Sequence, residues 1–243
     1  MHKEIALAIE PGLGDHFIHN GFVHHVSQFY DKIYLPVYDI AVHPNWATVC
    51  ELYQDNPSIV PVRIDRFVRH WEPNNSWTNL FSSWNIPVLQ PQLDHVHSGT
   101  PWYKWFYHQF LFPWSMWKSA AQLPATSCRA ERLFEQVVGN MQEYAVVHDL
   151  STAGHSPLEK MTSDLPQIRI VPGLSDSLLD WTAVLERASE IHVVASSVFC
   201  YTSLLHTRVK GRKFYHECRP KQFRIDPVDF GDWTLIDYGM PQQ

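Results

Sequence analysis

A glycine-rich turn followed by an acid is the clearest chemical feature of the sequence. The run Gly12-Leu13-Gly14-Asp15 comes shortly after the apolar stretch 5–9. Glycines at the end of a strand let a ligand approach the backbone, and the helix N-terminus that follows favours an anion or a polar group. A carboxylate here suits acceptance of a proton from a hydroxyl, so Asp15 is a candidate general base and His16 a rival one. The structural alternative is that Asp15 only caps the helix.

As a dinucleotide fingerprint, this turn is incomplete. Phe17 stands where the third glycine belongs, and the charge of Asp15 would repel a pyrophosphate. A nicotinamide-dependent oxidoreductase is therefore the weakest of the three functional classes that the sequence leaves open.

A second candidate site lies in the C-terminal half. Ser196 and Ser197 stand between the apolar run 191–195 and a segment with helical spacing. Their hydroxyls, together with the free N–H groups of a helix start, form the kind of anion site that holds a nucleotide diphosphate. Serine is also an ordinary helix cap, so a purely structural role remains equally open.

His148 ends another apolar stretch, 144–148, in the corresponding way. Ser151 and Thr152 follow it closely in a polar loop. Ligands of open α/β folds bind beyond the carboxyl ends of the strands. We therefore expect His148 and Ser151 to line the same donor site as Ser196 and Ser197.

The fifteen histidines and four cysteines do not form a metal-binding pattern. The densest group, Asp94-His95-Val96-His97, lacks the HExxH or Cys/His spacing of known sites, and no DxD triplet is present. We expect no metal site, with the histidines scattered over the surface. The cysteines show no CxxC spacing, which indicates reduced thiols in a cytoplasmic compartment.

Two further features have both a functional and a structural interpretation. The basic residues between Arg208 and Arg224 either contact a phosphorylated ligand or form a solvated face. Four tryptophans either stack on sugar rings or fill a core. They are Trp102, Trp105, Trp114 and Trp117.

Composition limits the class of protein. The chain has 243 residues, of which 45% are hydrophobic and 18% charged, so a substantial core is expected. A formal charge of −6 argues against a nucleic-acid-binding protein. No apolar run approaches the roughly 20 residues of a membrane span, and no signal-peptide pattern opens the sequence. We expect a cytoplasmic protein with no integral membrane segment.

The spacing of apolar residues predicts an α/β fold of two Rossmann-like lobes with a cleft between them. The lobes are expected at 1–140 and 141–225, with a C-terminal tail, 226–243, that packs back on them. Expected helices cover 15–29, 46–54, 102–112, 129–138, 177–188 and 198–207. Expected strands cover 5–9, 32–36, 59–64, 144–148, 168–171 and 191–195, and 66–101 is expected to be mostly loop.

Four blocks of sequence carry a family resemblance. They are EPGLGDHFIHNGFVHHV, FYHQFLFPWSMW, EYAVVHDLS and LDWTAVLERASEIHVVASSVFCYTSLL. Together they resemble small glycosyltransferase-like proteins of the GT-B type and, at a distance, the lipopolysaccharide heptosyltransferases of glycosyltransferase family 9. The resemblance runs from the first strand to about Phe214.

The resemblance implies roles for particular residues. Gly14-Asp15 matches a Gly-Asp pair that places the family's base beside the acceptor. His148 and Ser151 partly match a strand end of the donor lobe. Where the family has an Asp-Ser-Gly turn near the donor, this chain has Ala195-Ser196-Ser197, and the family's Pro-Gly after His148 is absent.

The function implied is a metal-independent glycosyltransferase with Asp15 as general base. The first lobe would bind a glycan or another hydroxyl acceptor, and the second a nucleotide-sugar, which serves as co-substrate so that no cofactor is needed. The alternative is a non-catalytic glycan- or nucleotide-binding protein with the same fold.

Overall fold

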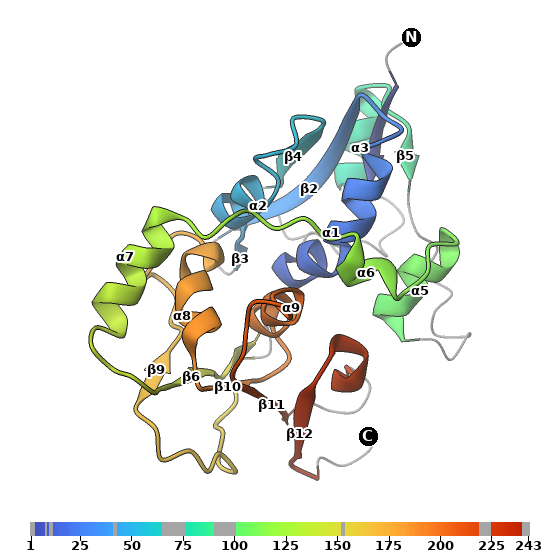
Figure 1. Ribbon diagram of the computed structural model, residues 1–243. Helices are drawn as coiled ribbons and strands as arrows, with labels where there is room; N and C mark the ends of the chain where they lie inside the picture. Colours follow the sequence, from blue (N-terminus) through green and yellow to red (C-terminus); the bar gives the residue numbers. More distant parts are fainter. Residues whose placement is uncertain are drawn as a thin grey trace. The chain divides into compact units, whose positions relative to one another are not determined.

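The computed structural model describes residues 3–7, 9, 12–40, 43–64, 76–89, 101–151, 154–218 and 225–239. The chain divides into two compact units, Met1–Pro124 and Ala125–Gln243, and each contains its own parallel sheet (Figure 1). This confirms the predicted α/β class.

In the first unit, four parallel strands lie in the order β4-β2-β1-β5, and β3 pairs antiparallel with the end of β2. The chain first builds the sheet to one side of β1 and then places β5 on the other side. The order of the strands therefore reverses between β1 and β5. The elements are β1 (Glu4–Leu7), α1 (Leu13–Val26), β2 (Lys32–Ile40), β3 (His43–Pro44), α2 (Trp46–Leu52), β4 (Ile59–Ile64), α3 (Ser76–Ser83), β5 (Val88–Leu89), α5 (Trp102–Gln109) and α6 (Met116–Ser119).

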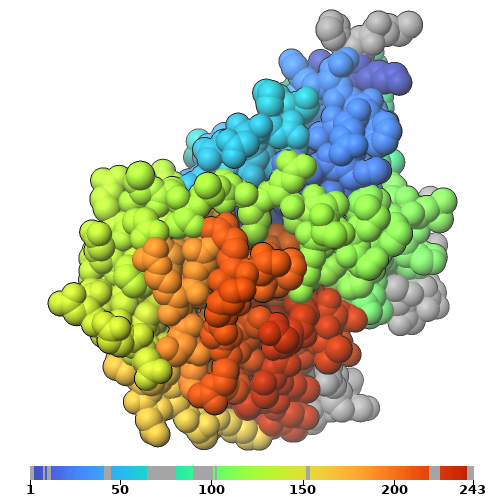
Figure 2. Space-filling view, in the orientation of Figure 1, coloured from blue at the N-terminus to red at the C-terminus, as the bar shows by residue number. Residues whose placement is uncertain are grey.

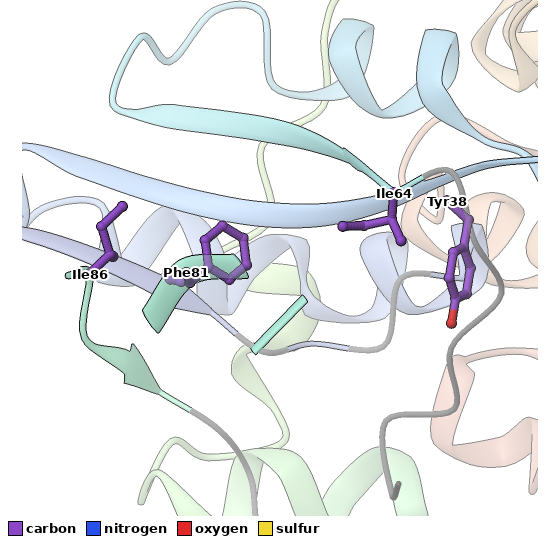
Figure 3. Packing of buried hydrophobic residues seen from close by; sticks show 5 residues of the cluster. Tyr38, Ile64, Phe81 and Ile86 are labelled. Carbon is purple, nitrogen blue, oxygen red and sulfur yellow. The ribbon is translucent and has the colours of Figure 1, made fainter. Parts of the chain in front are cut away.

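A small apolar cluster covers the first sheet on one side (Figure 3). It joins Ala6 of β1, Tyr38 of β2 and Ile64 of β4 to Phe81 of α3 and to Ile86. The described part of the expected loop region thus contains a helix and a strand. Helix α3 has eight residues and strand β5 has two, and both are too short for a hydrophobic period to be recognised in the sequence.

Helix α1 contacts the α6 region backbone to backbone. A Cβ atom on Gly21 would lie 2.9 Å from the carbonyl oxygen of Trp117 and 3.0 Å from the nitrogen of Ala121. Beside it, the Asn20 side chain accepts a hydrogen bond of 2.8 Å from the nitrogen of Gln122. A larger residue at position 21 would force these segments apart, so glycine is required by close approach.

In the second unit, five parallel strands lie in the order β12-β11-β10-β6-β9. The chain moves from β6 to β9 and then returns to the other side of β6 to continue with β10. The order of the strands therefore reverses between β6 and β10, and we call this place in the sheet the switch point. The elements are α7 (Cys128–Val137), β6 (Ala145–His148), β7 (Leu150–Ser151), β8 (Gly154–His155), β9 (Gln167–Arg169), a 3-10 helix (Leu178–Trp181), α8 (Thr182–Arg187), β10 (Glu190–Val193), α9 (Ser197–Leu204), β11 (Arg212–Glu217), a 3-10 helix (Pro227–Phe230) and β12 (Trp233–Asp237).

The two faces of the second sheet are covered differently. Helix α9 packs on one face, where Phe199 contacts Tyr215 and Trp233 with ring centroids 4.9 Å apart in both pairs. Helices α7 and α8 lie on the same side of the sheet (Figure 1). The other face carries Glu190 and His192, which alternate along β10 with the apolar residues of the first face.

The second unit begins earlier and ends later than expected. Helix α7, predicted within the lobe 1–140, packs on α8 and on the 3-10 helix before it, so it belongs to the second unit. Residues 233–237, predicted within a tail, form the edge strand β12 beside β11. Both differences arise because these segments find their apolar partners within the second unit.

Within the part of the chain that the structure describes, no helix combines the length and the apolarity needed to cross a membrane. The four cysteines are free thiols; Cys200 is buried and Cys128 is exposed.

The expectation that the histidines lie scattered on the surface is wrong for α1. His16, His19 and His24 are all buried. Burial lowers the pKa of His16 and His19 to about 3 and that of His24 to about 4. Among the described residues, neither ring nitrogen of His19 has a hydrogen-bond partner. Burial is the main cause that lowers its pKa, and the main chain of Asp15 opposes part of this shift.

These histidines make the unfolding free energy depend on pH. Between pH 6.5 and about 3 the unfolded chain binds a proton at His19 and the folded chain does not, so stability is lost as the pH falls. Each such group contributes up to ~1.4 kcal/mol per pH unit. We predict that His19→Phe removes one of these groups. The unfolding free energy of the variant minus that of the parent should be about 2 kcal/mol larger at pH 5 than at pH 7.

Urea denaturation at pH 7 and pH 5 measures this difference. His19→Gln is the matched control, because it also removes the titrating ring but keeps a buried polar group. We expect the same weaker dependence of the unfolding free energy on pH, together with a lower stability than the parent at pH 7. An unchanged pH slope in both variants would contradict the burial of His19 as a neutral ring.

Candidate functional site

The turn after β1 places Asp15 over Gly12. Gly12 is the N-cap of α1, with extended backbone (φ −72°, ψ 146°), and Asp15 is the third helical residue. A Cβ atom on Gly12 would lie only 2.6 Å from Oδ2 of Asp15, so the carboxylate folds back over this glycine. Gly12, and not Asp15, therefore occupies the N-cap position. The position of Asp15 in the first turn still favours an anion, because the N-terminal end of the helix dipole is positive.

His16, the rival base, lies in the core of the first unit. Its Nε2 atom is 3.2 Å from the carbonyl oxygen of Pro36 and donates to it, and its Nδ1 atom has no partner among the described residues. The ring is fully buried, and its pKa of about 3 keeps it neutral. The structure therefore gives His16 no access to a substrate, and it leaves Asp15 as the candidate base; Gly14 is simply the second residue of α1.

In the second unit the structure joins His148 to Ser196. His148 is the last residue of β6, and Ser196 follows β10, the neighbouring strand across the switch point. The Nδ1 atom of His148 lies 3.1 Å from Oγ of Ser196. The same hydroxyl donates to the carbonyl oxygen of Val194 at 3.1 Å and accepts from the nitrogen of Phe199 at 3.4 Å, which makes Ser196 the N-cap of α9.

These contacts determine which nitrogen of the His148 ring carries the proton. The hydroxyl of Ser196 has one hydrogen, and when it donates to Val194, His148 must donate from Nδ1. Burial lowers the pKa of His148 to about 4, against an opposite effect of the Asp149 charge. The ring is therefore neutral at pH 7. In this arrangement its Nε2 lone pair is available to a ligand proton.

The remaining predicted donor residues lie in two places. Ser197 is the first residue of α9, directly after Ser196. Ser151 lies in the β7–β8 hairpin, where its hydroxyl donates to the carbonyl oxygen of Gly154 at 3.3 Å. The structure thus brings together His148, Ser196 and Ser197 at the ends of β6 and β10, and it places Ser151 in the hairpin that follows β6. Thr152 lies outside the described residues.

A pocket of about 640 Å³ adjoins this strand end. Asp149, the residue after His148, contacts Arg169 at the end of β9, and its Oδ2 atom is 3.0 Å from Nε2 of His155. Arg169 and His155 are functional candidates that the sequence analysis missed. The pairing of β6 with β9 brings Arg169 to Asp149, and the β7–β8 hairpin brings His155 there. The pocket is lined by Asp149, Leu150, His155, Pro157, Leu158, Glu159, Arg169 and Val171.

A chain of polar groups runs from the buried Glu190 of β10 to Lys160, the residue that follows Glu159 of the pocket lining. The Glu190 carboxylate lies 3.1 Å from Nε2 of His192, whose Nδ1 atom is 3.0 Å from Nε2 of His216. Nδ1 of His216 is 3.0 Å from the hydroxyl of Tyr238, which accepts from the nitrogen of Lys160. A carboxylate only accepts, so with neutral rings every bond points toward Glu190. Burial is the main cause that lowers the pKa of both histidines, to about 4 for His216.

The basic segment is largely neutralised within the second unit. Arg208 contacts Glu186, Arg212 contacts Glu190, and the buried Lys213 contacts Asp232. These described members of the segment are part of the fold, and the positions from 219 to 224 lie outside the described residues. The solvated-face interpretation is therefore wrong for Lys213.

Two of the four tryptophans stack on each other. Trp117 is buried and stacks on Trp114 with centroids 5.2 Å apart, as the core interpretation predicts. Among the described residues, no group of three His, Cys, Asp or Glu is placed to hold a metal ion. The Asp94–His97 run lies outside those residues.

The comparisons with known proteins support the fold. No family model matches the sequence, and no curated protein matches it. The two parallel α/β units correspond to a GT-B-like glycosyltransferase fold. The chain is similar to the crystal structure of the glycosyl transferase family 9 from Veillonella parvula DSM 2008, with a TM-score of 0.51 and 10% identity, over 97% of this chain and 86% of that one. This confirms the family 9 resemblance at the level of fold.

We predict that Ser196→Ala destabilises the protein by about 1 kcal/mol, because α9 loses its N-cap and His148 loses its partner. Ser197→Ala, which removes a neighbouring hydroxyl, changes stability by less than about 0.5 kcal/mol. Ser196→Thr keeps the hydroxyl and should recover most of the loss. Urea denaturation of the three variants measures this, and equal effects of the two alanine substitutions would contradict the assigned role of Ser196.

Proposed function

We propose that the protein is a glycosyltransferase whose second unit binds a nucleotide-sugar. One observation carries the proposal: His148 and Ser196 are hydrogen-bonded at the switch point between β6 and β10. Ligands of doubly wound sheets bind at such points, beyond the carboxyl ends of the strands. The likeness of the fold to a family 9 glycosyl transferase structure supports the class of reaction.

The diphosphate of the donor is assigned to His148 and the start of α9. The first backbone N–H groups of a helix have no hydrogen-bond acceptor within the helix. The Ser196 hydroxyl accepts from the N–H group of Phe199. We assign the N–H groups of Ser197 and Val198 to phosphate oxygens of the donor. An anion beside Nε2 of His148 would raise the pKa of that ring from about 4. The ring then takes up a proton on binding and donates from Nε2 to the phosphate and from Nδ1 to Ser196.

The 640 Å³ pocket is assigned to hydroxyl-bearing parts of the donor. Its volume falls within the usual range for small-molecule sites. The carboxylates of Asp149 and Glu159 are acceptors that suit sugar hydroxyls, whereas Leu158 and Val171 offer apolar contact. Arg169 balances the charge of Asp149, which keeps that acid compatible with a nearby phosphate.

Asp15 of the first unit is assigned as the general base. The acceptor hydroxyl loses its proton to the carboxylate while its oxygen attacks the anomeric carbon of the donor. The bond from that carbon to the phosphate oxygen breaks, and the diphosphate leaves with the electron pair. Helix N–H groups and protonated His148 stabilise the leaving group, so the proposed reaction requires no divalent metal.

The alternative, a non-catalytic glycan- or nucleotide-binding protein, is favoured by one observation. Ala195-Ser196-Ser197 lacks the acid of the Asp-Ser-Gly turn in the family that the sequence resembles. A protein that binds the donor without turnover would keep the site of the second unit and show no dependence on Asp15.

We predict that a nucleoside diphosphate stabilises the parent protein by ~2.7 kcal/mol at about 100 times its dissociation constant. His148→Asn should weaken binding by about tenfold or more, because a charge-assisted hydrogen bond is lost. Thermal-shift titration with a panel of nucleoside diphosphates measures this. Absence of any stabilisation by the panel, or equal binding by parent and variant, would overturn the assigned donor site.

We predict that Asp15→Asn lowers turnover by ~10²–10⁴-fold and leaves donor binding unchanged. Gly12→Ala is a matched variant: its new methyl group displaces the Asp15 carboxylate, which lies 2.6 Å from that position, and turnover falls by a smaller factor. Sugar transfer from the bound donor is assayed with and without EDTA. Donor binding without transfer in the parent would favour the non-catalytic alternative, and loss of transfer in EDTA would contradict metal independence.

A further inference from the structure

One wall of the pocket has no regular secondary structure of its own. Four of the eight lining residues lie between positions 155 and 159, in the connection from β8 to β9. The structure describes every residue from the end of β8 at His155 to the start of β9 at Gln167, and it has no helix or strand between them. This part of the chain lies at the surface of the second unit, where its atoms are yellow in Figure 2. We call residues 155–160 the pocket segment; because it has few backbone hydrogen bonds of its own, its shape depends on contacts with the rest of the fold.

At its beginning, the pocket segment is attached to the end of β6. The nitrogen of Ser156 donates to the carbonyl oxygen of Asp149 at 2.8 Å, and Nε2 of His155 lies 3.0 Å from the carboxylate of the same residue. The β7–β8 hairpin closes directly before these contacts. They fix where the segment starts, but they do not reach its other end.

At its other end, the pocket segment is attached to residues that end and follow β12. The nitrogen of Lys160 donates to the hydroxyl of Tyr238 at 3.1 Å. The ammonium group of Lys160 donates to the carbonyl oxygen of Asp237 at 2.6 Å and lies 5.1 Å from the centre of the Tyr238 ring. Lys160 directly follows Glu159, which lines the pocket. These three contacts therefore fix the far end of the pocket wall.

Tyr238 is itself held by the sheet. Its hydroxyl lies 3.0 Å from Nδ1 of His216, to which it donates when the histidine rings are neutral, and it accepts from the nitrogen of Lys160. On the other side of Tyr238, the nitrogen of Gly239 donates to Oδ1 of Asp237 at 2.7 Å, in a turn where Gly239 has a φ of 66° that glycine adopts at low cost. One hydroxyl thus joins β11 to the pocket segment.

We propose that Tyr238 is a positioning residue of the donor pocket, which holds Lys160 and with it the wall formed by Leu158 and Glu159. The inference rests on the proposed function, because it assumes that the donor occupies this pocket. Without the hydroxyl, the nitrogen of Lys160 loses its acceptor, so the pocket segment opens more often and the fraction of protein ready to bind the donor falls. The diphosphate is assigned to His148 and the start of α9, outside the pocket segment, so its own binding should not depend on Tyr238.

The test compares the parent with Tyr238→Phe, which keeps the ring beside the ammonium group of Lys160 and removes only the hydroxyl. Hydrogen exchange of the ligand-free protein, followed by mass spectrometry, should be about fivefold faster in peptides that cover 156–161. The affinity for the tightest-binding nucleoside diphosphate of the panel should fall by about the same factor, whereas the affinity for inorganic pyrophosphate should stay unchanged. Titration calorimetry measures both affinities.

Lys160→Met is a second variant, because it keeps the backbone nitrogen but loses the contacts of the ammonium group with Asp237 and the Tyr238 ring. It should change exchange and nucleotide affinity in the same direction. Ser203→Ala is the matched control, because it removes a buried acceptor, 3.0 Å from Nε1 of Trp233 in β12. It should lower the melting temperature and leave the exchange of the pocket segment and both affinities unchanged.

Unchanged exchange in Tyr238→Phe would overturn the inference, and so would faster exchange with unchanged nucleotide affinity. An equal loss of affinity for pyrophosphate, or the same changes in Ser203→Ala, would show a general effect on stability and would also contradict it. A parent protein that binds no nucleoside diphosphate would refute the proposed donor site and the inference with it. Nucleotide binding that is equal in the parent and Tyr238→Phe would refute the inference alone.

Discussion

The hydrogen bond between Nδ1 of His148 and Oγ of Ser196, 3.1 Å long, is the interaction on which the proposed site depends. It links the ends of two strands that are neighbours in the sheet but 48 residues apart in the chain. It forms only because β6 and β10 pair in parallel, with Val193 opposite His148. The sheet order, and thus the switch point, must exist before this pair does.

Other features of the second unit keep that strand end in place. Ser196 also caps α9, so the same hydroxyl fixes both the helix start and the imidazole. On the opposite face, a chain of hydrogen bonds runs from Glu190 through His192 and His216 to Tyr238 and reaches the nitrogen of Lys160, the residue after the pocket-lining Glu159. Buried polar groups are costly unless each is hydrogen-bonded, and here each ring nitrogen of the two histidines has a partner.

Some elements were predictable because their residue types agree with their surroundings. The apolar runs of β1, β4, β6 and β10 have the composition of buried parallel strands, and Ser196 and His148 could be placed because they end two of them. Strand β11 was missed because its sequence, RKFYHE, has only two adjacent aromatic residues between charged residues and a histidine, and so forms neither an apolar run nor an alternating pattern. Its Lys213 is buried only because Asp232 pairs with it, which no local pattern reveals.

The site was predictable to the same extent. Strand ends identify His148 and Ser196, but the contact of Asp149 with Arg169 requires that β9 lie next to β6. The histidines of α1 show the opposite error. Their polarity indicates a surface, whereas the first unit buries them against rings such as Phe106 and Tyr53. Residue type predicts burial poorly where a ring can be buried in its neutral form.

The central claim, that His148 binds the donor diphosphate, is tested most directly by ¹⁵N NMR of the histidine ring during titration with a nucleoside diphosphate at pH 7. The account predicts a neutral ring with Nδ1 protonated in the free protein, and protonation of Nε2 as the ligand binds. A ring that stays neutral, with unchanged nitrogen shifts at saturating ligand, would contradict it.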